Sequence, residues 1–132
     1  MLFENELFEN KLTKPANGSD NVYRFCDFDG IKSEGNDFGD IFVGCTFKNC
    51  SWYWGMFNGA TLVNVKFIEC KFQGTAFSGS KFVECEFKNC EFLKDNLGAE
   101  CSFDGVAWYK CRQNNCVGLE REFRDKNWNS GS

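Results

Sequence analysis

Large apolar residues recur at every fifth position through the middle of the chain. Eleven consecutive positions of this series hold Phe, Trp or Leu without a miss: Phe47, Trp52, Phe57, Leu62, Phe67, Phe72, Phe77, Phe82, Phe87, Phe92 and Leu97. A spacing of five fits neither the 3.6-residue period of a helix nor the two-residue period of a strand. The pattern therefore predicts an architecture in which one short unit is repeated many times.

A small residue precedes each large one by two positions. This place holds Cys, Gly, Ala, Val, Thr or Ser in ten of the eleven units, and Asp95 in the last. The other three positions of each unit are mostly polar, so we expect one large and one small side chain to point inward and three to point outward. Asp40 also takes an inward place, and we expect both aspartates to accept hydrogen bonds from backbone N–H groups.

Residues that tolerate a positive φ angle stand two positions after many of the large ones. Six of these places hold Gly or Asn, namely Asn49, Gly59, Asn64, Gly74, Gly79 and Asn89. Type II turns need a positive φ at their third residue, and Gly and Asn adopt it most readily. Each unit is thus predicted to be a short extended piece followed by a corner. Four corners would close a square coil of twenty residues, and coils would stack at the strand spacing of ~4.8 Å.

When each residue is stacked on the one twenty positions later, large apolar residues meet large apolar residues and lysines meet glutamates. The large residues then form three columns, Phe47–Phe67–Phe87, Trp52–Phe72–Phe92 and Phe57–Phe77–Leu97. Among the outward residues, Lys66 meets Glu86 and Lys71 meets Glu91. A triangular coil would need a repeat of six, so a repeat of five favours the square.

The units CTFKN, CKFQG, CEFKN and CEFLK resemble the consensus of the pentapeptide-repeat family. This resemblance implies an all-β fold, a right-handed quadrilateral β-helix of about four to five coils over residues 21–108. The large residues change phase twice. Phe38 lies one residue out of step with Phe42, and Trp108 resumes one residue late, so we expect a one-residue deletion near Gly39 and a bulge near Glu100.

The two ends are expected to cap the helix, because an open coil exposes strand edges and core. Residues 1–20 are assigned as an N-terminal capping segment and loop, in which Asn5/Leu7 and Asn10/Leu12 keep the family phase. Residues 109–132 are assigned as a C-terminal cap or tail with a short helix, since Leu119, Phe123 and Lys126 lie at helical spacing. An end of the solenoid is also open to a homodimer contact.

The chain has nine cysteines and no histidine, and this limits the catalytic and metal sites that it could form. Zinc sites use close Cys pairs, but here the closest cysteines are separated by four residues. A reactive thiolate needs a positive partner and exposure, and the commonest partner, His, is missing. We therefore interpret Cys as a small apolar filler that stays reduced. No catalytic, metal or cofactor site is expected, and an enzyme is disfavoured.

One unit, SWYWGM, carries unusual outward residues. Tyr53, Trp54 and Met56 should all point to solvent, and such residues are enriched at protein interfaces. Two interpretations stay open: the group contacts a partner, or Phe3 and Phe8 of the N-terminal segment fold back over it. Leu119 and Phe123 are further candidates for protein contact.

The charge of the chain helps to choose between functions. The net charge is −4, with residues 1–44 at −5 and residues 45–99 at +1. No apolar run approaches a membrane span, and the acidic start lacks the features of a secretory signal, so we expect a cytoplasmic protein without nucleic-acid or membrane partners. We predict a scaffold that binds an unidentified protein. The family resemblance supplies the alternative of a DNA mimic that binds gyrase, but the near-neutral repeat region does not suit it.

Overall fold

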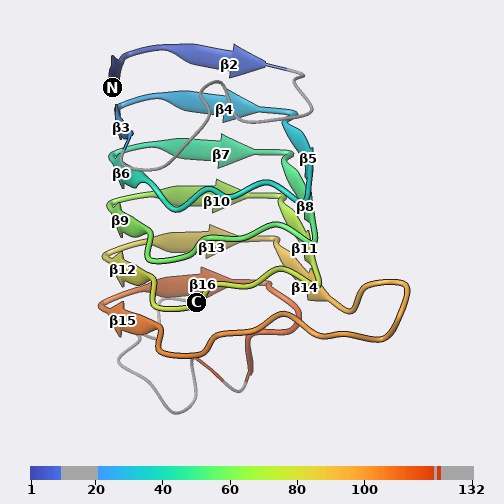
Figure 1. The fold of residues 1–132 in the computed structure, drawn as a ribbon. Helices are drawn as coiled ribbons and strands as arrows, with labels where there is room; N and C mark the ends of the chain where they lie inside the picture. Colours follow the sequence, from blue (N-terminus) through green and yellow to red (C-terminus); the bar gives the residue numbers. More distant parts are fainter. Residues whose placement is uncertain (10–20, 121, 123–132) are drawn as a thin grey trace.

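The computed structural model describes residues 1–9, 21–120 and 122, and these residues form a right-handed quadrilateral β-helix (Figure 1). Its strands are three residues long: β1 Leu2–Glu4, β2 Leu7–Glu9, β3 Val22–Arg24, β4 Asp27–Asp29, β5 Lys32–Glu34, β6 Ile41–Val43, β7 Thr46–Lys48, β8 Ser51–Tyr53, β9 Thr61–Val63, β10 Lys66–Ile68, β11 Lys71–Gln73, β12 Lys81–Val83, β13 Glu86–Lys88, β14 Glu91–Leu93, β15 Ala107–Tyr109 and β16 Arg112–Asn114. The repeat of five thus gives one short strand for each side of the coil.

Three parallel sheets and one irregular side make up the square (Figure 1). The first sheet has the order β1-β3-β6-β9-β12-β15, the second β2-β4-β7-β10-β13-β16, and the third β5-β8-β11-β14. We name them sheets A, B and C. Within the described residues the fourth side has isolated bridges in place of strands, Asp37 to Met56, Met56 to Ala76 and Ala76 to Ser102, and further backbone hydrogen bonds such as that from the Gly59 N–H to the Ser78 carbonyl at 2.9 Å. The coil of twenty residues is confirmed by the pairing of Phe67 with both Phe47 and Phe87.

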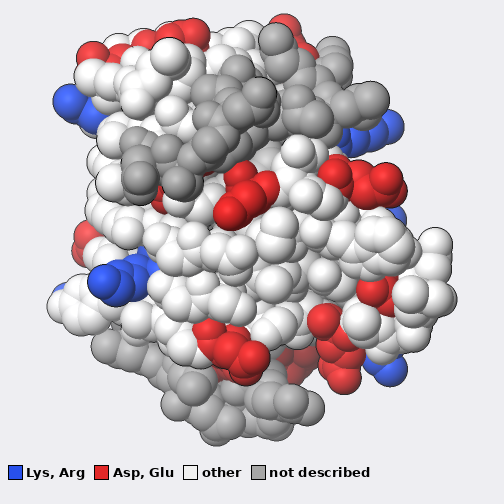
Figure 2. Space-filling model, viewed as in Figure 1, with Lys and Arg blue, Asp and Glu red and all other residues white. Residues whose placement is uncertain are grey.

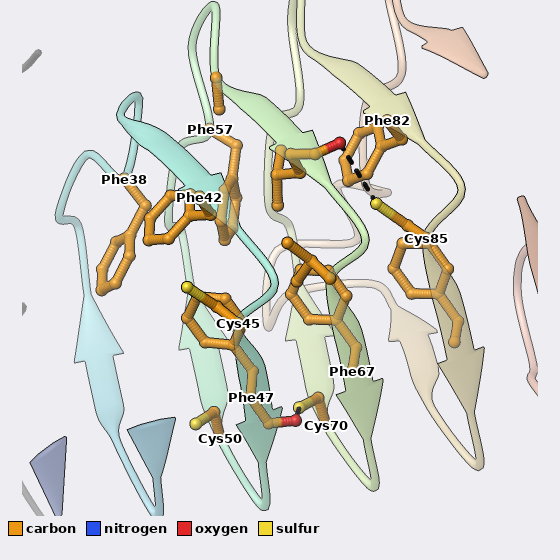
Figure 3. Packing of buried hydrophobic residues seen from close by; sticks show 14 of the residues in the cluster. Phe38, Phe42, Cys45, Phe47, Cys50, Phe57, Phe67, Cys70, Phe82 and Cys85 are labelled. Carbon is orange, nitrogen blue, oxygen red and sulfur yellow. Dashed lines mark hydrogen bonds between the residues drawn. The ribbon is translucent and has the colours of Figure 1, made fainter. Parts of the chain in front are cut away.

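The central residue of each strand points into the core, where aromatic rings stack from coil to coil (Figure 3). On sheet B the ring centroids are 4.4 Å apart for Phe28–Phe47, 5.0 Å for Phe47–Phe67 and 4.8 Å for Phe67–Phe87, with the rings nearly parallel. Rings on adjoining sides meet edge to face, as Phe67 and Phe72 do at 64°. Both geometries are favourable for aromatic pairs, so the core is bound by contacts along and across the stack.

The corners have the predicted backbone conformation. All six of the Gly and Asn positions have positive φ angles, from 53° at Asn49 to 67° at Gly79. Residues with no preference for this conformation adopt it as well, including Trp54 at 56° and Glu69 at 53°. The period of five, rather than the residue type, therefore decides where the chain turns.

The small inward residues do more than fill space. The Cys70 thiol donates to the carbonyl oxygen of Phe47 at 3.2 Å (Figure 3), and the Cys90 thiol donates to Phe67 in the same way at 3.2 Å. Thr75 makes the equivalent bond to Trp52 at 3.2 Å, and the Ser80 hydroxyl donates to the Phe57 carbonyl. Cys, Ser and Thr at this position thus satisfy a core-facing carbonyl of the preceding coil.

We expect the cysteines of the Cys50–Cys70–Cys90 column to resist labelling in the folded protein. All three are buried and free, and burial raises the pKa of Cys70 well above its ordinary value. Burial likewise raises the pKa of Cys45 to about 11. Because neighbouring coils enclose all three side chains of the column, a maleimide reagent at pH 8 should reach these residues only after unfolding. The half-buried Cys101 and Cys116 serve as internal controls that react first; mass spectrometry showing fast modification of Cys70 would contradict the buried column.

The predicted deletion near Gly39 is confirmed. Phe28 pairs with Phe47, nineteen residues later, whereas Phe47 pairs with Phe67, twenty residues later. In the shortened coil, the backbone at Gly39 lies close to that of the next coil on the fourth side. A Cβ atom at Gly39 would lie 2.3 Å from the carbonyl oxygen of Asn58. Asp40 beside it is buried and accepts a hydrogen bond from the Asn21 backbone N–H at 3.2 Å, as expected for an inward carboxylate.

The predicted bulge near Glu100 is larger than one residue. Phe82 pairs with Trp108, twenty-six residues later, so six residues are added to this coil. The added residues form a loop after β14, which projects from the lower right of Figure 1. The predicted column Phe57–Phe77–Leu97 is wrong at its last member, because Leu97 is 84% exposed and Phe103 stacks on Phe77 at 5.2 Å. Asp95 is likewise in the loop rather than inward.

The N-terminal residues form a first coil in a different phase from the prediction. Phe3 and Phe8 point inward, and they stack on Tyr23 and Phe28 at centroid distances of 4.9 and 5.1 Å. Leu7, which the predicted phase placed inward, is 58% exposed. The aromatic pairs decide the register because they continue the columns below them. Asn10 and Leu12 lie outside the described residues.

The sheets also pass the predicted boundaries at both ends. They begin at Leu2 and continue to Asn114, beyond the predicted limits of residues 21–108. Leu119 is buried at the C-terminal end, and the Glu122 backbone N–H donates to its carbonyl at 3.0 Å. Glu120 and Glu122 have helical conformation, whereas Phe123 and Lys126 of the predicted capping helix lie outside the described part of the chain. No helix among the described residues is long and apolar enough to cross a membrane.

Candidate protein-interaction site

Trp54 stands at the corner that follows β8, and the positive φ angle of this corner turns its side chain outward. The indole is 45% exposed. Its Nε1–H donates to Oδ2 of Asp95 at 2.6 Å, although the two residues are forty-one positions apart. The prediction that Trp54 points to solvent agrees with this exposure, and the structure adds that its polar edge is fixed.

Tyr53 precedes it on the outer face of sheet C. Its ring lies 4.7 Å from the Trp54 ring at an angle of 48°. The phenolic oxygen accepts a hydrogen bond from the backbone N–H of Asn96 at 2.9 Å. Both aromatic side chains therefore contact the inserted loop. The alternative in which Phe3 and Phe8 cover them is wrong, because those two rings stack over Tyr23 and Phe28.

The inserted loop is closed by Asp95. Its Oδ1 atom accepts hydrogen bonds from the backbone N–H groups of Leu97 and Ala99 at 2.8 and 2.9 Å. The Asp95 N–H donates in turn to the carbonyl of Ala99 at 2.9 Å. The bonds from the Ala99 backbone and the Trp54 indole lower the pKa of Asp95, because they stabilise its charged form. One carboxylate thus fixes both the loop and the indole.

Leu97 occupies the exposed tip of this loop. At 84% it is more exposed than any other large apolar residue described in the structure. The turn that presents it is held at Asp95 on one side and at Ala99 on the other. We name Tyr53, Trp54, Asp95 and Leu97 the loop platform. An apolar side chain on a braced loop beside two aromatic rings is a surface suited to contact with another protein.

The other predicted contact residues lie elsewhere. Met56 is on the fourth side, half-buried, and paired with Asp37 and Ala76. Leu119 is fully buried and so belongs to the core rather than the surface. Phe123 is outside the described residues. The predicted group of Tyr53, Trp54 and Met56 is therefore divided by a corner of the helix.

Two members of the loop platform were missed by the sequence pattern. Asp95 and Leu97 fall on the five-residue series, so the pattern assigns them as an inward pair. The available signal was the spacing of the next aromatic residues, since Phe103 and Trp108 each lie twenty-six positions after their stacking partners, Phe77 and Phe82. A coil of twenty-six residues needs a loop of six that leaves the stack.

The fourth side of the helix offers little other chemistry. Figure 2 faces the fourth side, whose centre is largely uncharged, with separate acidic residues and no cluster of Lys or Arg. Within residues 1–9, 21–120 and 122, no three Cys, Asp or Glu side chains are arranged to hold a metal ion. The loop platform is therefore the feature with the clearest capacity for recognition.

Comparisons with known proteins match the repeated part of the chain to a known kind of repeat. The family model for pentapeptide repeats matches residues 54–82 and 60–92, in eight copies. No curated protein matches the sequence. Among solved structures, the chain is similar to a pentapeptide repeat protein (Rfr23) from the cyanobacterium Cyanothece 51142, with 15% identity, a TM-score of 0.55, and 88% of this chain and 83% of that chain covered.

Structures of QnrB1, described as a plasmid-mediated fluoroquinolone resistance protein, also align. The full-length structure has 14% identity and a TM-score of 0.30, covering 97% of this chain and 82% of that one. A trypsin-treated form has 15% identity and a TM-score of 0.34, with 88% and 55% covered. The similarity to Rfr23 shows a shared fold, and the low TM-scores to QnrB1 support no inference about function.

Proposed function

We propose that this chain, which carries pentapeptide repeats, is a non-enzymatic scaffold that binds a partner protein through the loop platform. The observation that carries the proposal is Leu97, an apolar side chain that is 84% exposed on a loop closed by its own hydrogen bonds. Exposed leucine at a braced tip adds nothing to the core of this fold. It is well placed to enter an apolar pocket of another protein.

The bracing of the loop supports this function in energetic terms. Binding usually orders flexible side chains and loops, and that ordering costs about 0.5–1.5 kcal/mol for each immobilised side chain. Here the Trp54 indole and the Tyr53 hydroxyl already hold the loop at Asp95 and Asn96. A preorganised loop avoids part of the cost, so a small surface of this kind can bind usefully.

Several features favour a scaffold over an enzyme. The chain has no histidine, and its thiols on the inner columns donate to backbone carbonyls rather than to a substrate space. Burial raises the pKa of Cys45 and Cys70, which keeps them in the unreactive thiol form. Nine free thiols also suit a reducing compartment such as the cytoplasm.

The gyrase-binding DNA mimic is disfavoured by the charge on the outer faces. A mimic of DNA should present ordered negative charge along the rod. On sheet B, the outward residues of the last four strands include Lys48, Lys66, Lys88 and Arg112, with Glu86 between them in the register. Gyrase supercoiling measured with increasing protein tests this alternative; inhibition or protection that is lost in high salt would support the mimic over the scaffold.

Replacing Leu97 by Ser is expected to weaken partner binding by ~2 kcal/mol or more, the scale of an interface hot spot. The fold should be unaffected, because the side chain is exposed and surface changes usually alter stability by less than ~0.5 kcal/mol. The partner is first captured by cross-linking in lysate of the source cells, and its affinity is then measured with purified proteins. Trp54→Phe, which keeps an aromatic ring but loses the indole N–H that binds Asp95, should cause a smaller loss.

The matched control is Leu2→Ser, which changes another exposed leucine at the opposite end of the solenoid. Equal affinities for the unchanged chain, Leu97→Ser and Leu2→Ser would show that the captured protein binds away from the loop platform. A melting temperature lowered only by Leu97→Ser would show instead that the loop supports the fold.

A further inference from the structure

Sheet C has a hollow in its outer face beside Tyr53. The hollow has a volume of about 350 Å³, and its lining includes Ser51, Tyr53 and Gln73. This is near the lower end of the ~300–1,000 Å³ typical of ligand pockets. It is therefore large enough to receive an aromatic side chain.

The hollow results from one small residue in a row of long ones. Lys32, Ser51 and Lys71 are register partners on β5, β8 and β11, so their side chains follow one another along the outer face. Ser51 is too short to fill the space between the two lysines. The residues of the next row, Glu34, Tyr53 and Gln73, are paired in the same way and form the opposite wall.

Tyr53 gives this wall a fixed aromatic surface. Its hydroxyl is held by the Asn96 N–H at 2.9 Å, which anchors the far end of the side chain. The near end is set by the strand. A ring fixed at both ends offers its face to a second ring without loss of its own freedom, and aromatic pairs in offset or edge-to-face contact are favourable.

The charged residues around the hollow determine whether a negative or a positive group is attracted to it. Lys32 and Lys71 are exposed on either side of Ser51. Within the described residues an ion pair joins Arg24 and Glu4, and Glu91, the register partner of Lys71 on β14, lies on the side of Lys71 away from Ser51. Glu34 lies in the other row, beside Tyr53, and repels an anion from that side. A negative group is therefore directed toward the row of lysines.

We propose that this hollow receives an aromatic side chain from an acidic segment of a partner protein. The ring lies over Ser51 against Tyr53, and neighbouring carboxylates approach Lys32 and Lys71. The proposal rests on the scaffold function, because Tyr53 belongs both to the hollow and to the loop platform. It adds the chemistry of the partner: an exposed acidic stretch that contains an aromatic residue.

The test uses two synthetic peptides of equal length, in which a single Trp is flanked by glutamates in one and by lysines in the other. NMR titration of the full chain should shift the amide signals of Ser51, Tyr53 and Gln73 with the acidic peptide only. Ser51→Leu, which fills the hollow, and the pair Lys32→Glu with Lys71→Glu should each weaken this binding about tenfold or more. Thr61→Leu makes the same kind of change on sheet A, outside the hollow, and should leave binding unchanged.

Three results would overturn the proposal: no shifts with the acidic peptide, equal shifts with the basic one, or unchanged affinity in Ser51→Leu. These results are separable from those for the scaffold function. If Leu97→Ser weakens capture of the natural partner while Ser51→Leu does not, the loop platform binds protein and the hollow is not part of the contact. If neither variant changes capture but the acidic peptide still binds in the hollow, the proposed chemistry stands and the loop platform fails.

Discussion

Replacing Phe72 by Ala is expected to destabilise the protein by about 3–5 kcal/mol, the usual cost of truncating a buried phenylalanine. The ring is fully buried between Trp52 and Phe92, at centroid distances of 4.8 and 4.6 Å. It also meets Phe67 and Phe77 edge to face at 5.7 and 5.4 Å. Alanine would remove all four contacts and leave a cavity that the rigid coils cannot close.

The control for this change is the neighbouring residue Lys71. Its side chain is exposed, so Lys71→Ala should alter the free energy of unfolding by no more than ~0.5 kcal/mol. Denaturant unfolding of the two variants measures the difference directly. Similar midpoints for both would mean that the alternation of inward and outward residues on β11 is wrong.

Gly39 and Gly55 are the two glycines of the described residues whose φ angle is not positive. Of these two, Gly39 is expected to lose more stability on replacement by Ala. A Cβ atom at this position would lie 2.3 Å from the backbone oxygen of Asn58, and a backbone atom cannot turn aside as a side chain can. Moving the backbone at Gly39 away from the backbone at Asn58 would strain the shortened coil. We expect a loss of about 3 kcal/mol, at the upper end of the range for overpacking.

Gly59→Ala provides the comparison. Gly59 has a φ of 63°, and a Cβ atom there would meet nothing within 4 Å. Its cost should be that of the left-handed conformation alone, about 1–2 kcal/mol. Thermal unfolding of both variants ranks the two effects. A smaller loss for Gly39→Ala than for Gly59→Ala would show that the coils separate easily at the deletion.

The regular part of the fold could be predicted because each residue of a unit has the same task in every coil. Phe67 faces inward for the same reason as Phe47 and Phe87, and a single pattern therefore fixes register, coil length and corners together. Even Trp54, a residue with no preference for a positive φ, follows the period. The physical cause is the stack itself, since a corner in any other place would break the ladder on both neighbouring coils.

The irregular parts could not be predicted in the same way. Leu97 has the apolar character and the position of an inward residue, and only the pairing of Phe103 with Phe77 excludes it from the core. At the N-terminus both Leu7 and Phe8 could occupy the inward place, and the stack on Phe28 decides for Phe8. The loop platform depends on such long-range contacts, so Trp54 was found as a candidate but its partner Asp95 was not.

The coil that gains six residues and the coil that loses one show how this helix treats length. In each case the strands on both sides keep their partners, as β12 does with β9 and β15. The corner after β14 can therefore accept foreign segments, provided that the chain returns to Cys101 for the next side. Replacing the tip around Leu97 with a chosen peptide would turn the protein into a rigid carrier for epitopes or binding motifs, displayed at a fixed angle to a core that does not depend on them.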